Sequence, residues 1–431
     1  MESQQTICLL NDSFPPFIDG VANAVMNYAK FIEENDSKAM VITPDHPEAD
    51  DSGFSYPVVR YPSIDLRSKT GYMAGVPFSP EIAHRLDREN VAVLHSHCPI
   101  VSTLLARQLR QIVDAPLVLT YHTKFDIDIA NIIRSKALQS GSKKILVENI
   151  NACDEVWTVS QGAGENLRSL GFEGDYIVMP NGVDLPCQRV PEEQIAAVTG
   201  GFDLPQGVPV YLFVGRMMWY KGLKIILEAL SRLAAAGKDF RMVFVGQGAD
   251  CEEVKAYALQ CGIAGNCIFT GALHDREALR AWYCRADLFL FPSTFDTNGL
   301  VVREAAACAL ASVLIDGSCA AEGITHGENG FLIEETADSL FRCLLGLYDN
   351  RALVRAVGRN ASRQLYVSWE TAVKTAMDRY GTVIDRYKSG SYPRRRKPME
   401  YFLKANGELM EDLGHLVRLR EQLRQHVKER L

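Results

Sequence analysis

The sequence predicts an α/β protein built from two doubly wound, Rossmann-like domains and a C-terminal helical tail. Short apolar runs alternate with helix-period segments along most of the chain, a pattern typical of βαβ units and parallel sheets. This alternation stops near residue 181 and starts again near residue 210. A length of 431 residues also exceeds what one hydrophobic core usually holds, so two domains are expected.

Within the first domain, apolar runs predict the strands and the segments between them predict helices, among them 22–34, 101–112 and 136–152. The expected strands are residues 6–11, 38–43, 91–97, 116–122, 155–160 and 176–180. The second domain repeats the pattern, with helices at 222–236 and 300–309. Its expected strands are residues 210–215, 241–246, 267–271, 288–292, 313–316 and 330–334. We expect domains at 1–187, completed by a helix at 369–387, and at 188–368, facing each other across a ligand-binding cleft.

Residues 388–431 are expected to form a basic amphipathic helical tail. The tail has 11 Lys or Arg residues against 6 Asp or Glu, whereas the whole chain has a net charge of −7. Basic and apolar residues on one helix suit an anionic membrane surface, and an oligomerisation helix is the alternative. Arg134, Lys136, Lys143 and Lys144 form a second basic site. The acidic remainder of the chain argues against nucleic acid as a partner.

The bulk sequence also bears on location and on metals. No apolar run is long enough to span a bilayer, and the N-terminus has no signal-peptide pattern, so we expect a cytoplasmic protein, peripheral on the inner face of the plasma membrane. The 11 cysteines include no CxxC pair, and we expect thiols and no metal site.

Two basic residues flank the turn that follows the expected strand 210–215. Arg216 and Lys221 lie at the carboxyl end of a parallel strand, where open α/β sheets bind ligands. A guanidinium and an ammonium together suit a diphosphate, although ordinary surface positions would explain the same spacing.

A second candidate element follows the expected strand 288–292. It carries Asp296 and Gly299 before a helix that contains Glu304. A glycine at a helix N-terminus exposes free N–H groups and the positive end of the helix dipole, which together bind phosphate. Glu304 could accept hydrogen bonds from two ribose hydroxyls; capping by Asp296 and a structural role for either carboxylate stay open.

The first domain supplies a glycine turn and histidines. Gly20 opens a helix after a proline-rich loop, and histidines end two expected strands at His95-Ser96-His97 and at His122. His122 could hydrogen-bond the transferred sugar or the acceptor, or be a structural histidine. The i, i+2 pair His95 and His97 lacks a third ligand, which argues against a metal site.

In this order, the elements resemble glycosyltransferase family 4 of the GT-B fold, over roughly residues 5–387. The matching pieces are residues 19–21, 95–97, 120–123, 180–184, 214–216 with 221–222, and 296–304. The stretch 294–323 is most similar to bacterial diacylglycerol glucosyltransferases. The chain departs from the family pattern at Asp296, where Glu is usual, and at 309–311, where Ala-Leu-Ala replaces Gly-Leu-Pro.

The resemblance implies roles for these residues in binding a nucleotide-sugar without any further cofactor. Arg216 and Lys221 would hold the diphosphate, Glu304 the ribose, and Asp296 the sugar hydroxyls. Gly20 would close on the phosphates, and His122 would lie near the reacting centre. The loop Asn298, Gly299, Leu300 and Val301 would give backbone N–H groups to the phosphate and the sugar.

The implied activity is a metal-independent, retaining transfer of a hexose, with UDP-glucose as the expected donor and diacylglycerol or a glycolipid as the expected acceptor. A soluble or cell-envelope glycan is the alternative acceptor. An epimerase or a phosphorylase on the same fold, and an inactive scaffold that only binds a sugar nucleotide, are the competing functions.

Overall fold

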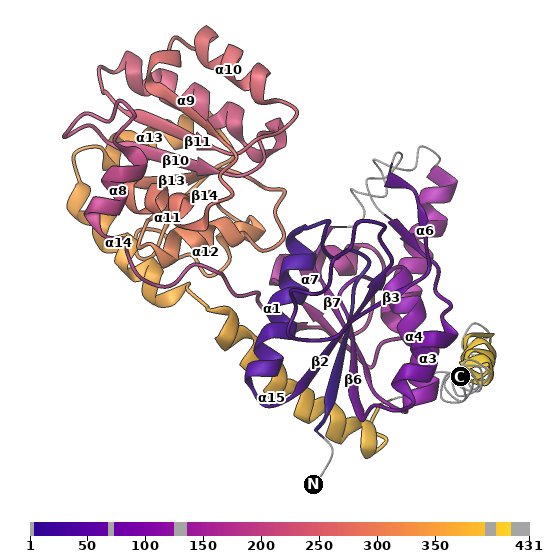
Figure 1. Cartoon of the computed structure of the whole chain (residues 1–431). Coiled ribbons are helices and arrows are strands. Elements are labelled where there is room, and N and C mark those ends of the chain that lie inside the picture. Colours follow the sequence, from indigo (N-terminus) through magenta and orange to yellow (C-terminus); the bar gives the residue numbers. More distant parts are fainter. Residues whose placement is uncertain (1–3, 68–72, 125–135, 393–401, 415–431) are drawn as a thin grey trace. The chain divides into compact units, whose positions relative to one another are not determined.

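The computed structural model describes residues 4–67, 73–124, 136–392 and 402–414, and it divides into two compact units (Figure 1). Unit 1 is Met1–Pro180 together with Trp369–Leu431, and unit 2 is Asn181–Ser368. The chain thus builds most of unit 1, then all of unit 2, and returns to unit 1 at its last long helix. The division falls at residue 180, a little before the expected boundary at residue 187.

Unit 1 is built on a seven-stranded sheet of order β3-β2-β1-β6-β7-β8-β9, in which every neighbouring pair is parallel. All six expected strands are present, which confirms the predicted parallel sheet. The strand β3 and the antiparallel hairpin β4–β5 were not expected. The strands of the seven-stranded sheet are, in chain order, β1 (Thr6–Leu10), β2 (Lys38–Pro44), β3 (Val58–Tyr61), β6 (Val91–Ser96), β7 (Leu117–Tyr121), β8 (Glu155–Thr158) and β9 (Ile177–Val178). The separate hairpin is formed by β4 (Ser63–Asp65) and β5 (Met73–Gly75).

The helices of unit 1 include one that arrives from the far end of the chain. Helix α15 packs on α1, and Arg379 of α15 donates to both carboxylate oxygens of Glu155 over 2.7 and 2.6 Å. Because Glu155 is buried, this charged pair fixes α15 on the sheet of unit 1. The helices are α1 (Gly20–Glu34), α3 (Pro80–Leu86), α4 (Val101–Val113), α6 (Lys136–Asn151), α7 (Gln161–Ser169) and α15 (Trp369–Lys388).

Unit 2 is a six-stranded parallel sheet of order β12-β11-β10-β13-β14-β15, and its strands lie where the sequence predicted them. They are β10 (Val210–Val214), β11 (Arg241–Val245), β12 (Cys267–Gly271), β13 (Leu288–Phe291), β14 (Ser312–Ile315) and β15 (Phe331–Ile333). The α-helices are α8 (Glu192–Thr199), α9 (Leu223–Ala235), α10 (Cys251–Gln260), α11 (Arg276–Arg285), α12 (Leu300–Ala307), α13 (Ala337–Leu347) and α14 (Arg351–Gln364). Short 3-10 turns are η1 (Trp219–Lys221), η2 (Ala264–Asn266) and η3 (Cys319–Ala321).

Each sheet has one point where the strand order reverses. In unit 2 this is the neighbouring pair β10 and β13, because the chain adds β11 and β12 on one side and β14 and β15 on the other. In unit 1 it is the neighbouring pair β1 and β6. Ligands of open α/β sheets bind outside the carboxyl ends of the strands at such a switch point. A ligand-binding site is therefore expected at the loops that follow these four strands.

At the switch point of unit 2, two glycines bring backbone segments into close contact. Gly222 precedes α9 with φ of +78°, and a Cβ there would overlap the carbonyl oxygen of Pro292, just after β13. Gly299 precedes α12 with φ of +57°, and a Cβ there would lie 2.9 Å from the Cα of Ala320. Glycine alone combines a left-handed conformation with so little space, so these two residues set the path of both loops.

The described part of the tail is a helix over residues 402–414 that packs on unit 1. Leu403 and Met410 are buried, and Met410 belongs to the hydrophobic core of this unit. The backbone N–H of Ser79, at the start of α3, donates to the Met410 sulfur over 3.2 Å. Part of the apolar face that the sequence analysis offered to a membrane or an oligomer is therefore used within unit 1.

Two apolar side chains of the same helix, Phe402 and Leu409, stay exposed. The basic segment 394–397 and residues 415–431 lie outside the described residues, as does Arg134 of the second basic site. Within the described ranges, no helix combines the length and the apolar character that crossing a bilayer demands.

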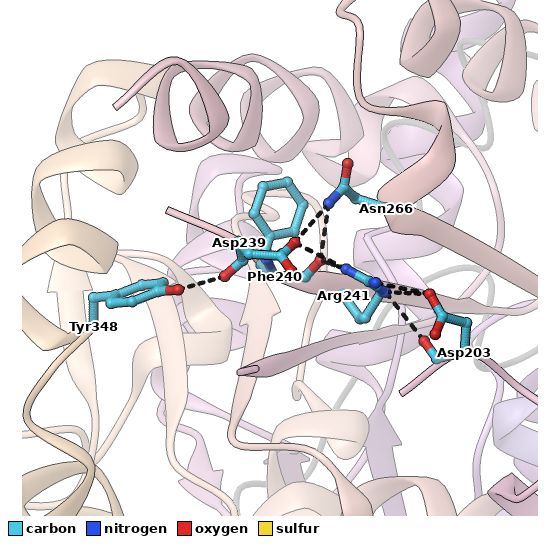
Figure 2. A network of polar contacts seen from close by, with 6 residues as sticks. All are labelled: Asp203, Asp239, Phe240, Arg241, Asn266 and Tyr348. Atoms are coloured by element: carbon cyan, nitrogen blue, oxygen red, sulfur yellow. Dashed lines mark hydrogen bonds and ion pairs between the residues drawn. The ribbon is translucent and has the colours of Figure 1, made fainter. Parts of the chain in front are cut away.

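A polar network lies at the amino ends of β11 and β12, the edge of the unit 2 sheet opposite to the switch point (Figure 2). Arg241 is its centre, and its guanidinium donates to the carboxylates of Asp203 and Asp239 over 2.7 and 2.9 Å. Asn266 donates to the Asp239 carboxylate over 3.1 Å, and the Tyr348 hydroxyl donates to the Asp239 carbonyl over 2.7 Å. The network joins four segments of unit 2 without reaching the ligand-binding edge, so it should act on stability alone.

We predict that Arg241→Met lowers the free energy of unfolding by about 1–2 kcal/mol, because the carboxylates of Asp203 and Asp239 lose a largely buried charged partner. The change is measured as a lower urea midpoint of unfolding. Arg232→Met is the matched control, since its partner Asp338 and Arg232 itself are both half exposed and such pairs contribute about 0–1 kcal/mol. An equal midpoint for the two variants would contradict the stabilising role of the network.

We also predict that Gly222→Ala lowers the melting temperature far more than Gly237→Ala. Both glycines have nearly the same positive φ, +78° and +75°, but no atom lies within 4 Å of a Cβ at Gly237. Gly237→Ala should cost only the backbone strain of about 1–2 kcal/mol. The alanine at 222 must in addition displace the Pro292 carbonyl, so similar melting temperatures would show that the close contact is absent in solution.

Candidate active site

The switch point of unit 2 brings together most of the site residues that the sequence suggested. Arg216 and Lys221 follow β10, whereas Asp296 and Glu304 follow β13, and these two strands are neighbours. The residues come from segments about 75 positions apart in the chain, yet the Lys221 ammonium lies 2.8 Å from both carboxylate oxygens of Asp296. The two loops that the sequence analysis treated separately therefore form one site.

The ion pair between Lys221 and Asp296 is largely shielded from water. The two side chains are 9% and 21% exposed, and the hydroxyl of Ser293 donates to Asp296 over 2.7 Å. The rings of Tyr220 and Phe295, one from each loop, pack on each other at 4.4 Å beside the ammonium. Partial burial strengthens this charge pair and holds Lys221 in a defined place.

Arg216 differs from Lys221 in that its charge is unmatched. The residue is exposed, and within the described ranges its guanidinium has neither a hydrogen bond nor an ion pair. A free guanidinium on the same loop as a held ammonium gives this edge of the sheet the capacity to bind an anion.

The start of helix α12 is also open. Its N-cap is Gly299, no side chain caps the helix, and the N–H groups of Leu300 and Val301 find no acceptor among the described residues. Asn298 just before it is 8% exposed, and neither atom of its amide has a hydrogen-bond partner in the described part of the chain. Unsatisfied buried amides are costly, so this loop is built for a ligand that supplies the missing hydrogen bonds.

Glu304 is buried within a small polar cluster. Its carboxylate accepts from Arg276 over 2.8 Å and from the hydroxyl of Tyr283 over 2.9 Å. Arg276 also lies 3.7 Å from Asp184, in the segment 180–184 that resembles the family. Each carboxylate oxygen keeps a second lone pair, so Glu304 can still accept from a ligand hydroxyl.

Arg276 and Tyr283 were not predicted as site residues from the sequence. They lie on α11 at i and i+7, two turns apart on one helix face, and that spacing is the one signal in the sequence that they act together. Burial, followed by the negative charge of Glu304, raises the pKa of Tyr283 well above its ordinary value, so its hydroxyl stays a donor.

In unit 1, the loop after β1 leads to Gly20 at the start of α1. The carboxylate of Asp19 accepts from the N–H groups of Val21 and Ala22 over 2.9 and 2.7 Å, so part of this helix N-terminus is already satisfied. Gly20 is exposed, and no atom lies within 4 Å of a Cβ placed there. Its backbone is therefore open to a ligand, whereas the N–H groups next to it are occupied.

The loops after β6 and β7 bring His97 and His122 together in a buried cluster. Nδ1 of His97 lies 2.9 Å from Nε2 of His122, and the ring of His95 packs on His97 with centroids 4.1 Å apart. Burial lowers the pKa of His122 to about 3, and it also lowers the pKa of His95 and of His97, which neighbouring histidines depress further. These rings are therefore neutral near pH 7 and act as hydrogen-bonding groups.

No group of three His, Cys, Asp or Glu side chains in the described ranges is arranged to hold a metal ion. Metal independence itself remains a prediction from the sequence.

Comparison with known proteins agrees with this arrangement. Residues 18–186 match the model of Glycosyltransferase Family 4, and residues 200–364 match that of Glycosyl transferases group 1. The crystal structure of HepE from Anabaena in complex with UDP superposes with a TM-score of 0.70 at 17% identity, over 88% of this chain and 100% of that one.

Two relatives illustrate what similar chains do. A GDP-mannose-dependent alpha-mannosyltransferase of Corynebacterium glutamicum is 26% identical over 338 residues, 76% of either chain. An alpha-monoglucosyldiacylglycerol synthase of Acholeplasma laidlawii is 22% identical over 393 residues, 88% of this chain and 98% of the relative. The chain belongs to the glycosyltransferases in which a family 4 domain precedes a group 1 domain in a GT-B fold.

Proposed function

We propose that the protein is a metal-independent, retaining hexosyltransferase that moves glucose from UDP-glucose to a lipid acceptor such as diacylglycerol or a glycolipid. The observation that carries this proposal is the anion-binding edge of unit 2. There, Lys221, the unmatched Arg216 and the uncapped start of α12 surround the switch point. Donor groups that are fixed before the reaction stabilise negative charge best, because they need no reorganisation when the charge develops.

In the proposed reaction, the bond between the anomeric carbon and the β-phosphate oxygen breaks, and the electron pair leaves with the nucleoside diphosphate. An acceptor hydroxyl forms the new bond on the same face of the sugar, and its proton passes to the departing phosphate oxygen. Arg216, Lys221 and the N–H groups of Leu300 and Val301 would stabilise the departing diphosphate. Gly20 of unit 1 would contribute its open backbone to the phosphates.

The remaining site residues would orient the donor. Asp296, whose carboxylate holds Lys221, would accept hydrogen bonds from hydroxyls of the glucosyl group. The buried amide of Asn298 would form its missing hydrogen bonds with the nucleotide-sugar. Glu304 would accept from the ribose, with Arg276 and Tyr283 fixing its carboxylate. His122 would hydrogen-bond the transferred sugar.

A lipid acceptor is supported by apolar side chains on the surface of unit 1. Phe402, Leu409 and Ile145 are exposed, and Ile145 follows Lys143 and Lys144 directly. Exposed apolar side chains next to lysines suit an anionic membrane surface. A glycan acceptor is the second candidate, because the name of the relative from Corynebacterium glutamicum gives a donor and no lipid. UDP-glucose is the first donor to test, since the resemblance to diacylglycerol glucosyltransferases points to it.

We predict that the protein transfers glucose from UDP-glucose to diacylglycerol in mixed micelles, and that Lys221→Met lowers kcat about 10²–10³-fold, as expected for the loss of one preorganised donor. Lys238→Met is the control, because Lys238 pairs with Asp349 on the surface. The assay compares UDP- and GDP-sugars against lipid and glycan acceptors. Binding of the donor without transfer or hydrolysis would favour an inactive scaffold. Conversion of the donor to another sugar nucleotide in the absence of any acceptor would favour an epimerase.

We also predict that the double variant Phe402→Ser/Leu409→Ser sediments less with anionic vesicles than the wild type. Point variants are preferable to deleting residues 388–431, because the deletion would uncover the core around Met410. Leu259→Ser, at a leucine of unit 2 that is even more exposed, is the control. Unchanged vesicle binding together with a smaller mass in light scattering would instead assign this face to an oligomer.

A further inference from the structure

The hydrogen bond between His97 and His122 constrains which nitrogen of each ring carries the proton. Nδ1 of His97 and Nε2 of His122 are 2.9 Å apart, so one of them must donate and the other accept. Both residues are buried, and both are neutral near pH 7. Each ring therefore carries one proton, and two arrangements of the pair remain.

The other nitrogen of His97 decides between these arrangements. Nε2 of His97 is buried and has no hydrogen-bond partner among the described residues. If His122 donated, His97 would carry its proton on Nε2 and would leave a buried N–H without an acceptor. If His97 donates from Nδ1, only a lone pair is left unsatisfied at Nε2, and orphaned acceptors are more common in proteins than orphaned donors.

In the described part of the chain, no group near His97 accepts a hydrogen bond from its Nε2. The neighbouring His95 uses both of its nitrogens, with Nδ1 2.6 Å from the Tyr380 hydroxyl and Nε2 2.7 Å from the Thr120 hydroxyl. The ring of Tyr28 also packs on His97, with the ring centroids 5.1 Å apart and the ring planes inclined at 69°. His95 thus holds His97 by packing, and the Nδ1 donor of His97 is directed to His122.

We propose that His97 is a positioning residue that donates from Nδ1 to Nε2 of His122 and so holds His122 with its own proton on Nδ1. His122 then presents an N–H donor away from His97, which suits a hydroxyl oxygen of the transferred sugar, and it has no free lone pair to act as a base. The effect on catalysis rests on the proposed function, whereas the position of the proton does not.

The proton position is tested directly by the ¹⁵N chemical shifts of the histidine rings in the free protein, with the His122 signals assigned by their loss in His122→Gln. We expect a protonated Nδ1 and an unprotonated Nε2 in His122. A protonated Nε2 would overturn the proposal. Because this measurement needs no substrate, it stands even if transfer to lipids is not observed.

Two variants of His97 then separate donation from packing. In His97→Asn the amide nitrogen replaces Nδ1 as donor, so the His122 tautomer and most of kcat should be kept. His97→Asp offers an acceptor only, which draws the His122 proton to Nε2. The donor that faces the sugar is then lost, so kcat should fall about 10²-fold with little change in the donor KM, as expected when one preorganised donor is removed.

Tyr380→Phe is the matched control for this cluster. It removes a hydrogen bond of equal burial from His95 and leaves the pair of His97 and His122 intact, so kcat and the His122 ¹⁵N shifts should not change. Melting temperatures show whether each variant is folded. Equal kcat for folded His97→Asn and His97→Asp would overturn the proposal, because His97 would then act by its volume alone.

Discussion

The backbone contact between Gly222 and the carbonyl of Pro292 is the constraint on which the candidate site depends. It joins the loop after β10 to the loop after β13, although 70 residues separate them in the chain. Lys221 precedes this contact and Asp296 follows it, so the contact brings an ammonium and a carboxylate within 2.8 Å of each other. Without it, the two charges would lie on separate loops, where the conformational entropy of long side chains opposes such a pair.

The helix N-termini of the molecule fall into two kinds, and the difference marks where an outside anion can bind. The starts of α1 and α11 are capped by Asp19 and Asp275, and the start of α4 receives the carboxylate of Asp12, which accepts from the N–H groups of residues 101 and 102. These N-termini are satisfied by side chains of unit 1 or unit 2. Helices α8, α9, α10 and α12 have no side-chain cap. Of these four, α9 and α12 begin in the loops after β10 and β13, so their positive ends lie at the switch point of unit 2.

The fold was predictable because apolar alternation reports directly on buried parallel strands. Every strand of unit 2 lies at an expected position, because each contains a run of apolar residues, and the central strands β10, β13 and β14 are buried along their whole length. The pattern failed for β3, β4 and β5, which are three or four residues long and only partly buried. Short exposed strands leave no apolar run to recognise, and tertiary context decides their pairing.

The site was predictable to the extent that it follows the ends of strands. Arg216, Lys221 and the segment from Asp296 to Glu304 could be placed at one sheet edge because strand order and chain direction determine that edge. The partners of Glu304 could not, because Arg276 and Tyr283 reach it from a helix whose packing angle no local pattern encodes. Burial of the tail residues Leu403 and Met410 could not be predicted either, because it also depends on how a helix packs.

The candidate site residues of the two units differ in charge, and in the proposed reaction this difference suits the two ends of a nucleotide-sugar. Unit 1 keeps His95, His97 and His122 neutral by burying them beside one another, so the cluster offers hydrogen bonds without charge. Unit 2 keeps fixed charges, with Lys221 held by Asp296 and Arg216 free. In the proposed reaction, negative charge collects on the diphosphate while the sugar becomes electron-poor. As proposed, a neutral His122 beside the sugar would avoid placing a positive group against the developing oxocarbenium ion, which a protonated histidine would do.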